Sequence, residues 1–179
     1  MTEGHTPAVL ASRIHQPGCP WNWTNECHED FAKFRQVDEE AVEILIAQAR
    51  RAYRDGVPPL ENSNRDDRRQ VSHRCPVGDQ VLARENHGFT NKRPMPWTGE
   101  LYAESEDGQT LFRLYFAERR SSWAPPTTDI VGCGVGTKPV AENTDWTPDQ
   151  QTDSIWNAMN SAIDFCINTR FVWRKWNTA

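Results

Sequence analysis

Two alternating polar side chains and one lysine have the chemistry needed to handle a phosphodiester. Arg113 and Tyr115 alternate with apolar residues in the run 109–117. Lys138 follows the glycine-rich run 128–136. Arginine and lysine bind phosphate and stabilise the charge that develops on it in a transition state, and a tyrosine hydroxyl can orient a reacting group or exchange a proton. The simpler alternatives are a salt bridge for Arg113 on a solvent-exposed sheet face and cross-strand packing for Tyr115.

A small antiparallel sheet is needed to bring these side chains together. Its strands are predicted at residues 97–104, 109–117 and 128–136. Asp107-Gly108 is a strong signal for the hairpin turn between the first two. Alternation predicts one apolar face, made of Phe112, Leu114, Phe116, Val131, Cys133 and Val135. The opposite face combines Arg113, Tyr115 and, if the third strand extends, Lys138 with three glycines, and it predicts a flat glycine floor where a phosphodiester could lie.

Three helices are predicted around this sheet. A short helix spans 28–36, and a longer one starts after Asp38, a good N-cap, and stops at Gly56. The segment TPDQ at 147–150 is a capping box with proline at the first helical position, and the helix that it starts ends near Asn168.

The order of these elements predicts an α+β fold. We expect a small antiparallel β-meander with two N-terminal helices and one C-terminal helix packed on one of its faces, plus a long insertion. We expect residues 1–179 to form a single domain with a core at 28–56 and 97–167, an N-terminal arm at 1–27, an insertion at 57–96 and a basic aromatic tail at 168–179.

The charge is unevenly distributed along the chain. The formal net charge of -5 argues against a protein that coats nucleic acid by bulk charge. Residues 139–169 carry five acids and no base, whereas the tail carries Arg174 and Lys175 beside tryptophans that could stack on bases. No apolar run approaches the length of a membrane span, no signal peptide is evident, and five cysteines form no regular framework, so we expect a cytoplasmic protein without membrane contact.

Cysteine and histidine residues offer two further possibilities. Cys19, Cys27, His73 and Cys75 could make a zinc site, but they contain no CxxC pair, and we expect no metal and no cofactor. His73 or His87 could instead supply an acid or base above the meander, because histidine titrates near neutral pH.

Four segments, taken in order, carry a resemblance to a known family. They are FAKF at 31–34 with the helix that follows it, GELY at 99–102, FRLYF at 112–116, and VGTK at 135–138 followed by a helix that contains Ile155. In this order they resemble the RelE/HigB-like toxins of type II toxin–antitoxin systems, in the RelE/ParE superfamily. The resemblance covers roughly 28–56 and 97–167, and Ala103-Glu104 stands where the family commonly has a basic residue.

The resemblance implies a metal-independent mRNA endonuclease that acts on the ribosome and is neutralised by a cognate antitoxin. Arg113 and Lys138 would then be the catalytic cations and Tyr115 would orient or exchange a proton. Lys92 and Arg93 resemble basic residues that the family has before its sheet, and we expect them to bind RNA together with the basic residues of the tail, Arg174 and Lys175.

Three alternatives remain open at this point. The first is a gyrase-directed toxin, which the same superfamily includes, because a fold does not fix a function. The second is a non-catalytic module on the same scaffold that binds a protein partner through its acidic helix and Trp-rich loops. The third is a zinc-stabilised interaction domain.

Overall fold

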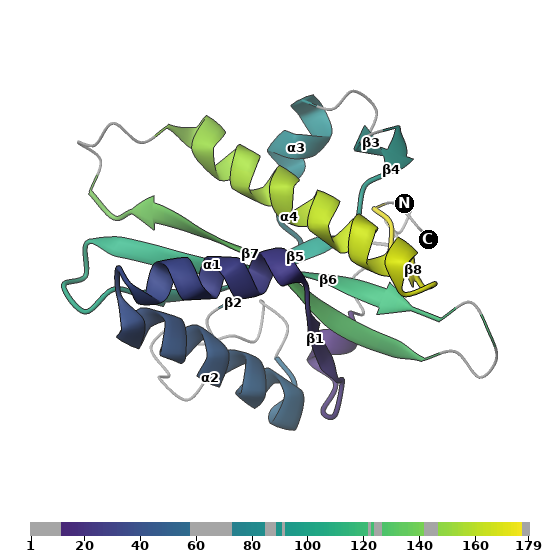
Figure 1. Cartoon of the computed structure of the whole chain (residues 1–179), viewed down its shortest axis with the longest axis horizontal. Helices are drawn as coiled ribbons and strands as arrows, with labels where there is room; N and C mark the ends of the chain where they lie inside the picture. The colour runs from purple at the N-terminus through teal and green to yellow at the C-terminus, as the bar shows by residue number, and fades with distance from the viewer. Residues whose placement is uncertain are drawn as a thin grey trace, which may run out of the picture.

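The chain folds around a single mixed sheet (Figure 1). The structure is a computed structural model that describes residues 12–57, 73–84, 89–90, 92–121, 123, 127–141 and 147–176. The helices are α1 (Asn25–Arg35), α2 (Glu39–Asp55), α3 (Asp79–Arg84) and α4 (Pro148–Asn168), with a 3-10 turn, η2, at Arg13–His15. The strands are β1 (Trp21–Trp23), β2 (His73–Arg74), β3 (Phe89–Thr90), β4 (Arg93–Pro94), β5 (Thr98–Glu104), β6 (Thr110–Arg120), β7 (Thr128–Pro139) and β8 (Val172–Trp173).

The sheet has the strand order β1-β7-β6-β5-β2, and β8 also pairs with β6. β5, β6 and β7 form the predicted antiparallel meander, and β1 adds to its edge in parallel to β7. The short strands β3 and β4 pair only with each other among the described residues. The predictions of an α+β fold and of a mostly antiparallel sheet are therefore confirmed.

The helices lie on both faces of this sheet, not on one face as predicted. In Figure 1, α1 and α2 lie on one side of the strands and α4 with α3 on the other. One apolar core joins α1 and α2 to Leu114 and Phe116, and a second joins α3 and α4 to Tyr115 and Ala117. Both faces of β6 are thus buried, which makes the architecture a three-layer arrangement.

A β-bulge in β7 explains part of this difference. Tyr115 lies opposite Gly134 but Phe116 lies opposite Gly132, so Cys133 is an extra residue in β7. The extra residue moves Cys133 and Val131 to the α4 side, where they join the second core, while Val135 stays with the first. Simple alternation would have kept all three on one face.

Local signals set the ends of the main helices. The carboxylate of Asp38 accepts a hydrogen bond from the Ala41 backbone N–H at 2.9 Å, and Gly56 ends α2 with a φ of 73° that favours glycine. α1 begins earlier than predicted, because Thr24 acts as its N-cap and accepts from the Cys27 N–H at 3.2 Å. The capping box of α4 is present, with the Thr147 N–H donating to the Gln150 side chain at 3.2 Å.

The segments outside the predicted core also contribute to the sheet. The 1–27 arm supplies β1, the described part of 57–96 supplies β2, α3 and the β3–β4 hairpin, and the tail supplies β8.

No helix among the described residues combines the length and apolar character that a membrane crossing needs.

Candidate functional site

An ion pair on two neighbouring strands forms the centre of the candidate site. Arg113 on β6 and Glu100 on β5 lie on the sheet face that α4 covers, and Arg113 Nη1 lies 3.4 Å from Glu100 Oε2. The side chains are 6% and 1% exposed. Pairing in the hairpin places Glu100 directly opposite Tyr115, so all three side chains belong to one cluster. We call Glu100, Arg113 and Tyr115 the Glu100 centre.

Glu100 is a buried carboxyl group surrounded by positive charge. Burial raises its pKa, while the charges of Arg113, Arg74 and Lys138 act in the opposite direction. Lys138 lies on β7, which extends to Pro139, and pairs with Leu111 on the same side as Arg113. The structure therefore brings Lys138 close to the Glu100 centre, as the alternation along the strand predicted.

Tyr115 is kept protonated by its surroundings. Burial and then the charge of Glu100 raise its pKa above the usual value, and a hydrogen bond with Arg113 opposes that rise. At neutral pH its hydroxyl therefore carries a proton.

Among the described residues, Arg113 Nε is buried without a hydrogen-bond partner, so this guanidinium has an unused donor.

A cavity of about 270 Å³ opens next to Glu100. It lies between the turn after β2, the start of α3 and the first turns of α4, and Arg74, Gly78, Pro148 and Gln151 contribute to its walls. Arg74 is exposed at its entrance, and the N-terminal end of α4 adds a positive partial charge. The cavity therefore combines the positive charge of Arg74 and of a helix N-terminus with the carboxylates of Asp79 and Glu100.

The predicted glycine floor is not open beside Arg113 and Tyr115, although Gly134 and Gly136 line a separate groove between α1 and α4. Tyr115 is 1% exposed and Arg113 5%, because α4 packs over them. A Cβ atom added at Gly136 would lie 3.0 Å from Ser154 Cβ and 3.1 Å from Tyr115 Cε2. Glycine at position 136 therefore makes room for α4 and for the ring of Tyr115, and not for RNA. The prediction that this face is accessible was wrong. The alternative was right that Arg113 forms a salt bridge and wrong that the sheet face is exposed to solvent.

The remaining residues predicted to bind RNA do not join this cluster. Lys92 and Arg93 are exposed at the β3–β4 hairpin, and Lys175 is exposed in the tail. Arg174 is buried instead: it is 4% exposed, and its Nη1 lies 3.2 Å from Glu118 Oε2. Its guanidinium also lies over the Trp97 ring, at 4.5 Å from the ring centroid. Arg174 therefore packs within the fold, whereas the prediction placed it at an RNA-binding surface.

The four residues considered as possible zinc ligands do not converge. No three of the described His, Cys, Asp and Glu residues form a group that could hold a metal ion. Cys75 Sγ lies 3.6 Å from His73 Nδ1, but Cys19 approaches Thr128 and Cys27 lies on α1. The zinc-site hypothesis is therefore wrong.

His73 is not placed as an acid or base at the Glu100 centre. His73 pairs with Leu101, one residue away from Glu100 on β5, and so faces the opposite side of the sheet. That interpretation of His73 was wrong, and His87 lies outside the described residues.

Sequence reasoning missed Glu100 as a functional residue. The signal was available, because the Asp107-Gly108 turn sets the hairpin register, and that register pairs Glu100 with Tyr115.

Comparison of the chain with known protein families, curated proteins and solved structures finds no match.

Proposed function

We propose that this chain is a RelE/HigB-like toxin: a metal-independent endoribonuclease that cuts mRNA on the ribosome and is neutralised by a cognate antitoxin. The observation that carries the proposal is the Glu100 centre, where a buried carboxyl with a raised pKa lies among arginines and a lysine at a cavity. The order of two helices, an antiparallel meander and a final helix adds support, since the resemblance implies that order.

The proposed reaction uses the ribose 2′-hydroxyl as the nucleophile. Glu100 removes its proton, the 2′-oxygen attacks the adjacent phosphorus, and the 5′-oxygen leaves with a proton supplied by solvent. Tyr115, which stays protonated, would orient the reacting phosphate. The products are a 2′,3′-cyclic phosphate and a 5′-hydroxyl. A raised pKa brings Glu100 nearer to neutral pH, where acid–base catalysis by a carboxyl is most effective.

Positive charge near the carboxyl would stabilise the transition state. Arg113, with its unused Nε donor, and Lys138 would bind the oxygens of the phosphorane, and Arg74 would receive the RNA at the cavity entrance. Because α4 covers Arg113, the scissile phosphate would approach the Glu100 centre through the cavity beside Glu100.

A non-catalytic protein-interaction module is the second candidate, and one observation favours it. Arg113 and Tyr115 are packed beneath α4, as expected of an ion pair and a ring that only stabilise the sheet. In that case a partner would bind elsewhere, and substitutions at Glu100 would alter stability but no cleavage activity.

Expression in growing cells separates the two candidates. We expect the wild-type chain to arrest growth and shorten mRNA, and Glu100→Gln and Arg113→Ala to do neither. The matched control is Glu118→Gln, because Glu118 is also a buried strand carboxyl paired with an arginine, and we expect it to remain toxic. Equal growth and intact mRNA for the wild type and all variants, at equal protein levels, would contradict the proposal.

A further inference from the structure

A second groove, of about 520 Å³, lies on the opposite face of the sheet from the Glu100 centre. It runs between β1, α1 and α2, and aromatic rings line it: Trp21 and Trp23 from β1, Phe31 from α1 and Tyr53 from α2. The ring centroids of Trp21 and Trp23 are 5.5 Å apart, as are those of Trp23 and Phe31. Trp21 and Trp23 are half-buried and Tyr53 is 49% exposed, so part of this aromatic surface remains open to solvent.

The charged side chains that line this groove are all positive, and a histidine adds one further basic group. Arg35, Arg50 and His28 line the groove, and none of its lining residues is acidic. Within the described part of the chain, the side chains of Arg50 and His28 make no hydrogen bond or ion pair. Arg35 is paired with Glu43 at 3.0 Å, but both side chains are about half exposed, so water weakens that pair.

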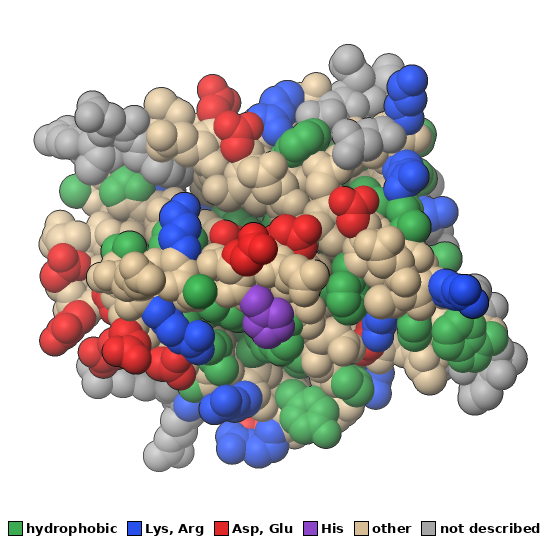
Figure 2. Space-filling model, viewed as in Figure 1, with side chains coloured by type: hydrophobic (Ala, Val, Ile, Leu, Met, Phe, Trp, Pro, Cys, Tyr) green, Lys and Arg blue, Asp and Glu red, His purple; other side chains and the backbone are tan. Residues whose placement is uncertain are grey.

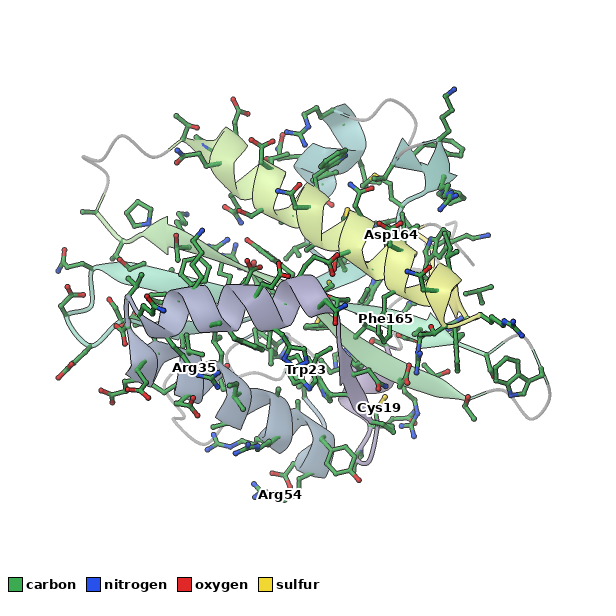
Figure 3. The ribbon with its side chains drawn as sticks, in the orientation of Figure 1. Cys19, Trp23, Arg35, Arg54, Asp164 and Phe165 are labelled. Atoms are coloured by element: carbon green, nitrogen blue, oxygen red, sulfur yellow. The ribbon has the colours of Figure 1, made fainter. Side chains whose placement is uncertain are left out.

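This absence of acids contrasts with the other side of the same helix. Towards α4, α1 presents Glu26, Glu29 and Asp30, together with Lys33, to a separate groove. Figure 2 shows these two surfaces: below the acidic side chains of α1, basic, histidine and hydrophobic side chains gather over α1 and α2. In Figure 3, Trp23 and Arg35 lie on the side of α1 that faces α2. The acidic side chains of α1 therefore do not line the aromatic groove, in a chain whose formal net charge is -5.

We propose that this aromatic–arginine groove binds single-stranded RNA, with a nucleobase stacked on its rings and the flanking phosphates on Arg50 and Arg35. Aromatic faces stack on any base, and arginine side chains bind phosphate oxygens in two-pronged contacts. An apolar peptide helix would use the rings but leave the guanidinium groups without partners. The groove does not depend on the Glu100 centre, so it can bind RNA whether or not the chain cleaves it.

Binding of a short RNA oligomer tests this proposal. We suggest a fluorescein-labelled 2′-O-methyl RNA 10-mer, which cannot be cleaved by 2′-hydroxyl attack, measured by fluorescence anisotropy together with quenching of tryptophan emission. We expect Tyr53→Ala to weaken binding about 5- to 100-fold through lost stacking. We expect Arg50→Ala to weaken it too and to reduce the salt dependence by about 0.7 in the log–log slope.

The matched controls use residues that do not line the groove. Arg51→Ala removes the same charge from the same helix, and Val37→Ala shortens an exposed apolar side chain, so we expect neither to alter affinity. Because the 2′-O-methyl oligomer cannot be cleaved by 2′-hydroxyl attack, its binding separates a failure of this proposal from a failure of the proposed cleavage.

Three outcomes would overturn the assignment. One is no binding of the 10-mer at micromolar protein. Another is binding that Tyr53→Ala and Arg50→Ala leave unchanged. AMP that binds as tightly as the 10-mer would assign the groove to a free nucleotide instead of RNA.

Discussion

Arg113 and Glu100 form an ion pair between adjacent strands that is almost completely excluded from water. Their side chains are 6% and 1% exposed, and the contact between Nη1 and Oε2 measures 3.4 Å. Buried charges depend strongly on each other, because each partner offsets part of the cost of removing the other from water. This relationship makes the pair a determinant of stability as well as the proposed centre of chemistry.

Removing one partner of this pair should destabilise the fold. At pH 7 we expect Arg113→Met to lower the free energy of unfolding by about 3–5 kcal/mol, because Glu100 is left buried without its cation. The double variant Arg113→Met/Glu100→Leu should recover most of that loss, since no buried charge remains. Urea denaturation measures both values. Arg93→Met, at an exposed arginine, is the control and should change stability by no more than about 0.5 kcal/mol. If Arg113→Met also changed the free energy of unfolding by no more than about 0.5 kcal/mol, the prediction would be contradicted.

The raised pKa of Glu100 should make its contribution to stability depend on pH. A carboxyl whose pKa is higher in the folded state binds its proton more tightly there, so its contribution is greatest below the ordinary pKa of 4.5. That contribution is lost as the pH rises from 4.5 through the raised folded pKa. We therefore expect the free energy of unfolding of the wild type, relative to Glu100→Gln, to fall across this window. The two proteins can be compared by urea denaturation at several pH values, and a difference that stays constant with pH would contradict the assigned direction.

The strand glycines should differ in their tolerance of a methyl group. At Gly132 an added Cβ would collide with the Trp23 indole, whereas at Gly134 its nearest neighbour is Ala158 Cβ at 3.4 Å, an ordinary contact. We expect Gly132→Ala to lower the free energy of unfolding by about 1–3 kcal/mol through overpacking. Gly134→Ala is the matched control, and we expect it to cost less than about 1 kcal/mol. Thermal and urea denaturation measure both, and equal losses would show that backbone preference, not packing, sets the effect.

Much of the sheet could be predicted because its signals are local. The Asp107-Gly108 turn and the alternating run that follows it specify a hairpin, and an N-cap with a glycine stop specifies α2. The bulge at Cys133 could not be predicted, because an extra residue depends on how the neighbouring strand and helices pack. Because the bulge was not foreseen, Val131 and Val135 were predicted to share one face of the sheet. All the helices were then predicted to pack on that same face.

The candidate site was predicted only in part for a related reason. Arg113, Tyr115 and Lys138 share a side of the sheet as alternation predicts, but their burial depends on α4, whose docking face no local signal reveals. Strand glycines can accommodate either a ligand or another part of the chain, and here Gly136 accommodates Tyr115 and α4.

Analysis of RNA ends by purified protein tests the central claim most directly. Ribosomes carrying a 5′-labelled mRNA are incubated with the wild type, Glu100→Gln or Glu118→Gln, and the ends of the fragments are identified. We predict fragments ending in a 2′,3′-cyclic phosphate with the wild type and with Glu118→Gln, and at least a 100-fold slower reaction with Glu100→Gln, as expected when an acid–base group is lost. No cleavage by the wild type, or equal cleavage by Glu100→Gln, would contradict the proposed role of the Glu100 centre.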